Sequence, residues 1–75
     1  MVKYMTSQKQ INNHAKNVKK FMKENNRYFI RNNERVRMQL GMNKKQLANV
    51  LQYLNKAGFL EPWNNKIYQI SHNSN

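Results

Sequence analysis

Cysteine is absent from this 75-residue sequence, which excludes disulfide bonds and thiolate metal sites and fits a reducing compartment. Long apolar runs are absent too. No stretch approaches the roughly 20 apolar residues of a membrane span, and the N-terminus lacks the apolar stretch of a signal peptide. We therefore expect a cytoplasmic protein that makes no contact with a membrane.

Acidic residues are scarce, and the titratable groups offer little for catalysis. The acids and histidines are Glu24, Glu34, Glu61, His14 and His72. Their spacing is not typical of a metal site, no glycine-rich loop is present to hold a phosphate, and no nucleophile lies beside a base. The sequence therefore predicts a protein that is not an enzyme and that uses no cofactor and no metal.

Basic residues, in contrast, are abundant. Fourteen lysines and arginines oppose three acidic residues, which gives a formal charge of +11 and an isoelectric point near 10.4. A compact chain with this charge repels itself unless a partner neutralises it. Nucleic acid is the commonest such partner, because each neutralised phosphate releases a counterion, while an anionic membrane surface and an acidic protein compete with it.

The length allows one small domain, since a chain of this size buries only about 60% of its unfolded surface. The hydrophobic fraction of 39% is low but sufficient for two or three packed layers. We expect a core over residues 7–70, a short arm at 1–5 and a loose polar tail at 71–75.

A first helix is predicted over roughly residues 7–25. Thr6 or Ser7 is a suitable N-cap, and the pair Asn25-Asn26 is a stop signal, because Asn tolerates the left-handed conformation that ends helices. Apolar residues recur on one face at helical spacing: Ile11, Ala15, Val18 and Met22. The opposite face is basic and polar: Lys9, Asn13, Lys16 and Lys20.

A short strand and a second helix are predicted next. Residues 28–30 form a β-prone triplet. Asn32 or Asn33 then caps a helix that carries Glu34 in its first turn, where the helix dipole favours an acid, and that ends at Gly41.

A third helix begins after the N-cap Asn43 and ends at Gly58. Its apolar stripe consists of Leu47, Val50, Leu51 and Leu54. A rotation of 100° per residue then directs Lys45, Asn49, Gln52 and Lys56 toward solvent. Residues 59–60 open a strand, 62–66 form a turn, and 67–70 form the returning strand of a hairpin.

This order of elements resembles the winged-helix family of helix-turn-helix domains. The resemblance covers about residues 9–70, and it is carried by residues 38–60, MQLGMNKKQLANVLQYLNKAGFL, followed by IYQI at 67–70. Family members share a Leu-Gly turn, a short polar run, an apolar helix ending in Gly, and hydrophobic strands. The resemblance implies an α+β, mainly α fold, a three-helix winged helix-turn-helix with a C-terminal β-hairpin wing.

The resemblance also implies that the third helix reads DNA. Asn and Gln can bond the edge of adenine, while Lys serves guanine or phosphate. The implied recognition-helix contacts are Asn43, Lys44, Lys45, Gln46, Asn49 and Gln52. The implied wing contacts are Asn64, Asn65 and Lys66, and the implied phosphate contacts near the second helix are Arg31, Arg35 and Arg37.

Two narrower interpretations remain open for aromatic residues. Trp63 either packs beneath the hairpin on the third helix or is an exposed contact. Winged helices that read left-handed DNA carry an Asn and a Tyr four residues apart, the spacing of Asn49 and Tyr53, and a Pro and a Trp in the wing. Alignment of the apolar stripe places Ala48 and Gln52 at those positions instead, which argues against this subfamily.

The sequence therefore predicts a sequence-preferring double-stranded DNA-binding protein, a small transcriptional or replication/partition regulator associated with the nucleoid. Its 14 asparagines and many lysines have A/T-rich codons, which points to a phage, a plasmid or an AT-rich bacterium. Half-site symmetry in DNA favours a homodimer.

The main alternative is an interaction module that binds and modulates an acidic host protein through Lys9, Lys16 and Lys20, since the outer face of a first helix usually points away from the DNA. RNA binding is disfavoured, because the sequence shows no aromatic stacking platform on a sheet face.

Overall fold

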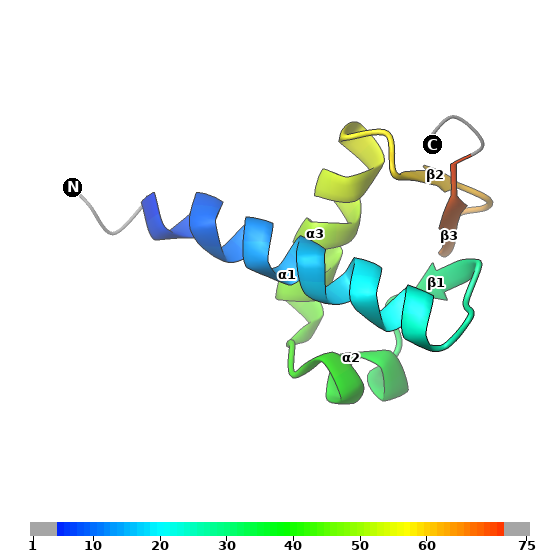
Figure 1. Cartoon of the computed structure of the whole chain (residues 1–75), viewed down its shortest axis with the longest axis horizontal. Helices are drawn as coiled ribbons and strands as arrows, with labels where there is room; N and C mark the ends of the chain where they lie inside the picture. Colours follow the sequence, from blue (N-terminus) through cyan, green and yellow to red (C-terminus); the bar gives the residue numbers. More distant parts are fainter. Residues whose placement is uncertain (1–4, 72–75) are drawn as a thin grey trace.

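The computed structural model describes residues 5–71, and the side chains of residues 9–71. In this part the elements follow the order α1 (Met5–Glu24), β1 (Phe29–Arg31), α2 (Glu34–Leu40), α3 (Lys44–Lys56), β2 (Leu60–Pro62) and β3 (Ile67–Ile70) (Figure 1). The predicted α+β, mainly helical class is confirmed. Residues 1–4 of the predicted arm and 72–75 of the predicted tail lie outside the described residues.

At both predicted ends, one residue close to the predicted core belongs to the fold. Met5 is the first residue of α1. Ser71 is buried, and its backbone N–H donates to the carbonyl of Phe59 at 2.9 Å. The short strand also begins one residue later than predicted, because Phe29–Arg31 is the segment that pairs with β3.

All three helices end in the same way. Each is followed by a residue with positive φ: Asn26 at 53°, Gly41 at 68° and Gly58 at 88°. The next N–H then bonds the carbonyl five residues earlier: Arg27 to Met22 at 2.8 Å, Met42 to Arg37 at 3.0 Å, and Phe59 to Leu54 at 3.0 Å. This Schellman geometry requires a left-handed residue, which Gly adopts freely and Asn tolerates. The predicted stop signals are therefore confirmed.

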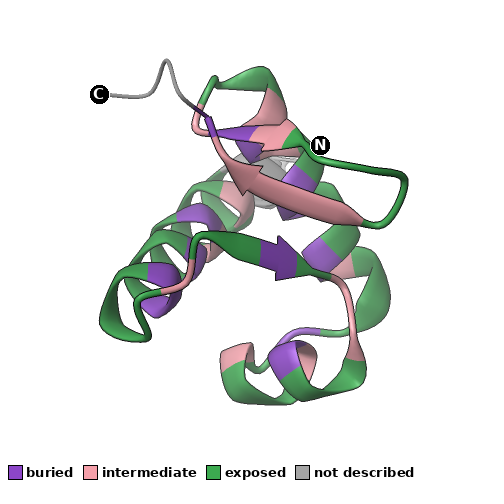
Figure 2. Ribbon diagram, turned by 90° about the vertical axis from the view of Figure 1, so that its right-hand side faces the viewer, coloured by how far each residue is buried: buried purple, intermediate pink, exposed green. Residues whose placement is uncertain are grey.

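Strand β1 joins the C-terminal hairpin in one antiparallel sheet, with the order β1-β3-β2. Ile30 pairs with Tyr68, and Leu60 pairs with Ile70, so these apolar side chains share the inner face. Figure 2 shows the consequence in β1, which is buried at its centre and exposed at both ends. The outer face carries the alternate residues: Phe29, Arg31, Glu61, Ile67 and Gln69.

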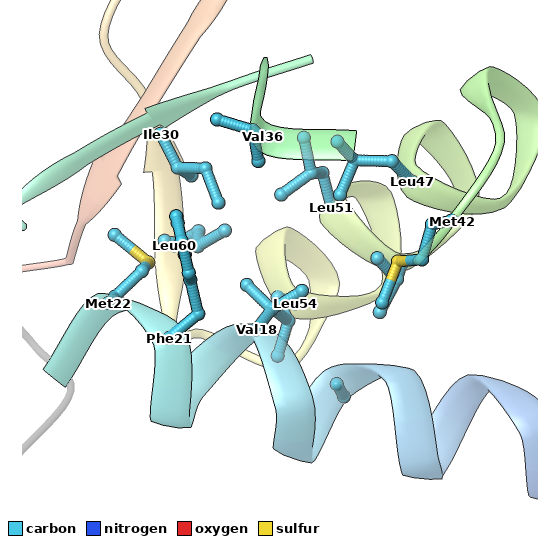
Figure 3. Close-up of a cluster of buried hydrophobic side chains, with 12 residues drawn as sticks. Val18, Phe21, Met22, Ile30, Val36, Met42, Leu47, Leu51, Leu54 and Leu60 are labelled. Carbon is cyan, nitrogen blue, oxygen red and sulfur yellow. The ribbon is translucent and has the colours of Figure 1, made fainter. Parts of the chain in front are cut away.

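The core lies where α1 crosses α3, and the sheet closes one side of it (Figure 3). The predicted stripe of α3 is fully confirmed: Leu47, Val50, Leu51 and Leu54 are all buried. Helix α1 contributes Ala15, Val18, Phe21 and Met22. Ile11 is only half-buried, because the N-terminal part of α1 projects beyond the other elements (Figure 1).

Candidate nucleic-acid interface

The side of α3 opposite the core is a polar, basic surface, which we call the α3 strip. Its members are Lys45, Asn49, Gln52 and Lys56, all of them exposed. They lie opposite the buried leucines and valine because a helix turns 100° per residue. The predicted outward direction of this strip is confirmed, and its amides and ammonium groups are available to a partner.

Two predicted base contacts at the start of α3 have a structural role instead of a free side chain. The Asn43 side-chain oxygen accepts from the Gln46 backbone N–H at 2.8 Å, and the Gln46 side-chain oxygen accepts from the Asn43 backbone N–H at 2.9 Å. This capping box satisfies two backbone donors that a helix start leaves unpaired. These bonds engage the side-chain oxygen of each residue and leave its amide NH₂ group for a ligand.

The arginine expected to clamp phosphate from α2 is also engaged within the fold. Arg37 is half-buried, and its Nη1 donates to the Asn32 side-chain oxygen at 2.8 Å. The Asn32 amide in turn donates to the backbone carbonyl of Lys44 at 3.0 Å. This chain of bonds fixes the start of α3 against α2, so Arg37 positions the helix, while Lys44 itself is exposed.

Asn32 is also not the cap of α2. Its neighbour Asn33 is the N-cap, because its side-chain oxygen accepts from the Val36 backbone N–H at 2.9 Å. The sequence left both asparagines open for this role, and the structure divides them between a cap and a link to α3.

A cleft of about 390 Å³ separates α3 from the β2–β3 hairpin. Its lining residues are Arg31, Asn32, Asn33, Ala48, Leu51, Asn65, Lys66 and Tyr68. Arg31 and Lys66 are exposed and bring two positive charges to the cleft from distant parts of the chain. Ala48 leaves room there, since its side chain ends at a methyl group. An anionic group fits this combination of charge and space.

The hairpin loop is shaped by one of its predicted contact residues. The Asn64 side-chain oxygen accepts from the backbone N–H groups of Lys66 and Ile67, both at 2.8 Å. Such a bond from Asn to the backbone two residues on is typical of a tight turn. Asn64 therefore holds the loop, and Asn65 and Lys66 present their side chains at the cleft.

Arg35 does not lie with the other predicted phosphate contacts. It is exposed on α2 and lines a separate shallow cleft with Glu34, Met38 and Gln39. Of the three predicted arginines, only Arg31 lies at the cleft between α3 and the hairpin.

Tyr53 lies beside the α3 strip and lines a shallow hollow with Asn49, Gln52 and Lys56. Its hydroxyl donates to the side-chain oxygen of Asn12 at 3.0 Å, which links α3 to α1. The Tyr53 hydroxyl is thus engaged within the fold, and Ala48, which has no amide, is the residue that lies at the cleft.

An exposed aromatic cluster, which we call the aromatic platform, consists of Tyr28, Phe29 and Trp63. The Phe29 ring meets Tyr28 at 5.3 Å and Trp63 at 5.5 Å between centroids, in edge-to-face geometry. Trp63 is 56% exposed, so of the two interpretations left open for it, packing beneath the hairpin on the third helix is wrong. The reason given above against RNA, the lack of an aromatic surface on the sheet, is also wrong.

Sequence reasoning missed this platform because its parts belong to different segments. The alternation Phe29, Ile30, Arg31 shows that Phe29 lies opposite a buried residue, and this signal was readable. Contact with Trp63 depends on the order β1-β3-β2, in which Trp63 reaches Phe29 from the far side of β3.

The lysines proposed for an acidic partner lie on a different surface. Lys9, Lys16 and Lys20 are exposed on the side of α1 opposite its buried residues. Lys19, on the flank, lies 5.1 Å above the centre of the Phe59 ring. This surface is basic, and Lys20 also lines a hollow of about 240 Å³ with Phe21, Glu24 and Leu40.

The part of the chain that the structure describes contains neither a cluster of metal ligands nor a candidate membrane span. Within residues 9–71, no three His, Asp or Glu side chains come together as a metal site. Among the described helices, none is both long and apolar enough to span a membrane.

No protein-family model matches this chain, and no match was found among curated proteins or among solved structures. Any functional assignment therefore depends on the residues and their geometry.

Proposed function

We propose that this protein is a winged-helix protein that binds double-stranded DNA through the α3 strip and the β2–β3 hairpin. The order of helices and strands and the three-stranded sheet support the winged-helix assignment, in which α3 is the recognition helix and the hairpin is the wing. We further propose a regulatory role in transcription or in replication and partition.

The observation that carries this proposal is the cleft between α3 and the hairpin. One wall belongs to a helix with an exposed row of amides and ammonium groups, and Arg31 and Lys66 line the cleft with positive charge. In such an arrangement the helix meets base edges in the major groove and the cations meet phosphates on either side. The net charge of +11 supports a polyanionic partner.

A salt titration of duplex binding tests the proposal. Lys44, Lys45, Lys66 and Arg31 are the cations placed to meet phosphate, and four contacts at about −0.9 each predict a log–log salt slope of roughly −3.5. Lys45→Ala should flatten this slope by about one contact and weaken all duplex sequences alike.

The matched control is Lys16→Ala on α1, which removes the same charge from an exposed helix position outside the interface. We expect it to change the slope far less than Lys45→Ala. If charge reversal at Lys16 and Lys20 abolishes binding while Lys45→Ala has no effect, the interface lies on α1 and the proposal is wrong.

A further inference from the structure

The aromatic platform is a pre-formed surface that the proposed duplex contact does not use. Tyr28 is 42% exposed, Phe29 43% and Trp63 56%. Such large rings dominate burial in folded proteins, so a cluster of them in solvent marks a contact surface. The ring geometry and a hydrogen bond from the Trp63 backbone N–H to the Ile67 carbonyl at 2.8 Å hold the platform in place.

Positive charge lies along one side of the platform. Arg31 follows Phe29 on the outer face of the sheet and is exposed. The guanidinium of Arg27 lies 5.4 Å from the centre of the Phe21 ring, at the end of α1 next to β1. Both arginines and Phe29 line a hollow of about 170 Å³.

The other side of the platform carries a negative charge, the carboxylate of Glu61. Gln69 donates from Nε2 to the carboxylate of Glu61 at 2.7 Å, and both residues lie on the outer face of β2 and β3. A polyanion would therefore follow the arginine side and avoid the carboxylate.

We propose that the aromatic platform binds single-stranded DNA, whose unpaired bases stack on Trp63 and Phe29 while Arg27 and Arg31 contact its phosphates. Aromatic rings beside a cationic track are the combination that binds single strands with little regard to sequence, because every base has a π-face. An apolar protein partner fits less well, since the rings are flanked by arginines on a chain of charge +11.

Arg31 connects the platform to the proposed duplex interface. It lines both the hollow beside Phe29 and the cleft between α3 and the hairpin. An unpaired segment that adjoins a bound duplex would thus reach the platform. The choice of DNA over RNA rests on the proposed function, whereas the stacking surface itself does not.

Trp63 is the only tryptophan of the chain, so its fluorescence reports on the platform directly. A single-stranded 12-mer oligothymidine should quench this fluorescence in a saturable titration, because a stacked base contacts the indole. The salt slope should be shallow, at roughly −0.7 per phosphate for Arg27 and Arg31. Absence of quenching at low salt overturns the proposal.

Variants separate stacking from a general loss of structure. Phe29→Leu keeps an apolar residue and the reporter, and it should weaken oligothymidine binding roughly 5- to 100-fold. Met38→Ala, at a residue 74% exposed on α2, is the matched control and should leave binding unchanged. Equal losses in both variants, with thermal unfolding curves like that of the wild type, contradict a stacking role.

A second pair of variants replaces Trp63 itself, so tryptophan fluorescence can no longer report binding. For these variants, binding is measured by the fluorescence anisotropy of a labelled oligothymidine. Trp63→Phe should retain most of the affinity, while Trp63→Ala should lose it to a similar extent as Phe29→Leu. If sedimentation instead shows self-association that Trp63→Ala abolishes, with no oligothymidine binding by the wild type, the platform contacts a second copy and the proposal is wrong.

Two further ligands are titrated: a blunt DNA duplex, which separates the two surfaces, and oligouridine, which tests the choice of DNA over RNA. Lys45→Ala should weaken duplex binding and leave oligothymidine quenching intact, and Phe29→Leu should do the reverse. Failure of duplex binding with persistent quenching refutes only the proposed function. Tighter binding of oligouridine than of oligothymidine refutes the choice of DNA.

Discussion

The α3 strip and the aromatic platform are two exposed surfaces of one small fold, and they arise in different ways. The α3 strip comes from a single helix, and its members follow one another at helical spacing. The platform joins residues 28–29 to Trp63, which approach only when β1 and the hairpin enter the same sheet. A surface within one element can be read from periodicity, whereas a surface shared between elements requires the topology.

The two surfaces also differ in what their side chains can do. The α3 strip presents amides and ammonium groups, which can discriminate among bases by hydrogen bonding. The platform presents rings with two neighbouring arginines, which bind bases without distinguishing them. Substitutions that affect one surface and spare the other test whether this division is real.

The largest loss of stability is expected from a substitution in the hydrophobic core on which both surfaces depend. Leu47 is fully buried between α3 and the rest of the core. Leu47→Ala should lower the free energy of unfolding by about 2–5 kcal/mol, measured by urea denaturation, because it leaves a cavity. Both duplex binding and oligothymidine binding should then fail together, and a cost within about 0.5 kcal/mol, as expected for Met38→Ala, would contradict this role.

Within the α3 strip, loss of the Asn49 amide should mainly affect sequence preference, unlike loss of the Lys45 charge. Asn49→Ala should reduce discrimination between cognate and mismatched duplexes by about 1–3 kcal/mol, because a bidentate contact to adenine is lost. The measurement is competition binding with duplexes that differ at one base pair. Trp63 quenching by oligothymidine should remain as in the wild type, and a parallel loss there would show that the two surfaces are one.

Substitutions of Asn43, the N-cap of α3, can separate its contribution to stability from any contribution to DNA binding. Asn43→Ala should cost about 1 kcal/mol of unfolding free energy, since the capping box is lost. Asn43→Ser keeps a neutral capping oxygen and should restore stability, as measured by thermal unfolding. It should weaken duplex binding only if the amide NH₂ of Asn43 contacts DNA.

The smallest expected change in unfolding free energy distinguishes two arginines of α2, Arg37 and Arg35. Arg37→Ala removes the hydrogen bond to Asn32 and should destabilise the fold by about 0.5–1.5 kcal/mol. Arg35→Ala, at an exposed position in the same helix, should stay within about 0.5 kcal/mol of the wild type. Equal effects in denaturant titrations would show that the link from α2 to α3 adds no stability.

Most of the helical framework was readable from local chemistry. The stripe around Leu47 and Leu54 gave the buried face of α3, and Asn26, Gly41 and Gly58 gave the helix ends, since each rule depends on a few neighbouring residues. The sequence did not show whether an individual polar side chain has a structural role or remains free to contact a ligand. Whether Gln46 contacts a ligand or caps a helix depends on where its side chain finds a partner.

The long-range contacts were the other part that the sequence could not give. Three contacts join segments that are distant in the chain or weakly patterned. They are the hydrogen bond from Ser71 to Phe59, the link from Arg37 through Asn32 to Lys44, and the contact of Trp63 with Phe29. A short strand such as β1 has no periodicity that specifies its partner or its register.

The sequence by itself therefore determined where the helices end, which residues of α1 and α3 turn inward, and how strongly the molecule attracts anions. These properties depend on backbone preferences, on the helical repeat and on summed charge, which are local or additive. Tertiary structure alone decided which polar side chains stay available, that Arg31 joins two hollows, and that the Trp63 ring meets Phe29, because these depend on strand order and packing between distant segments.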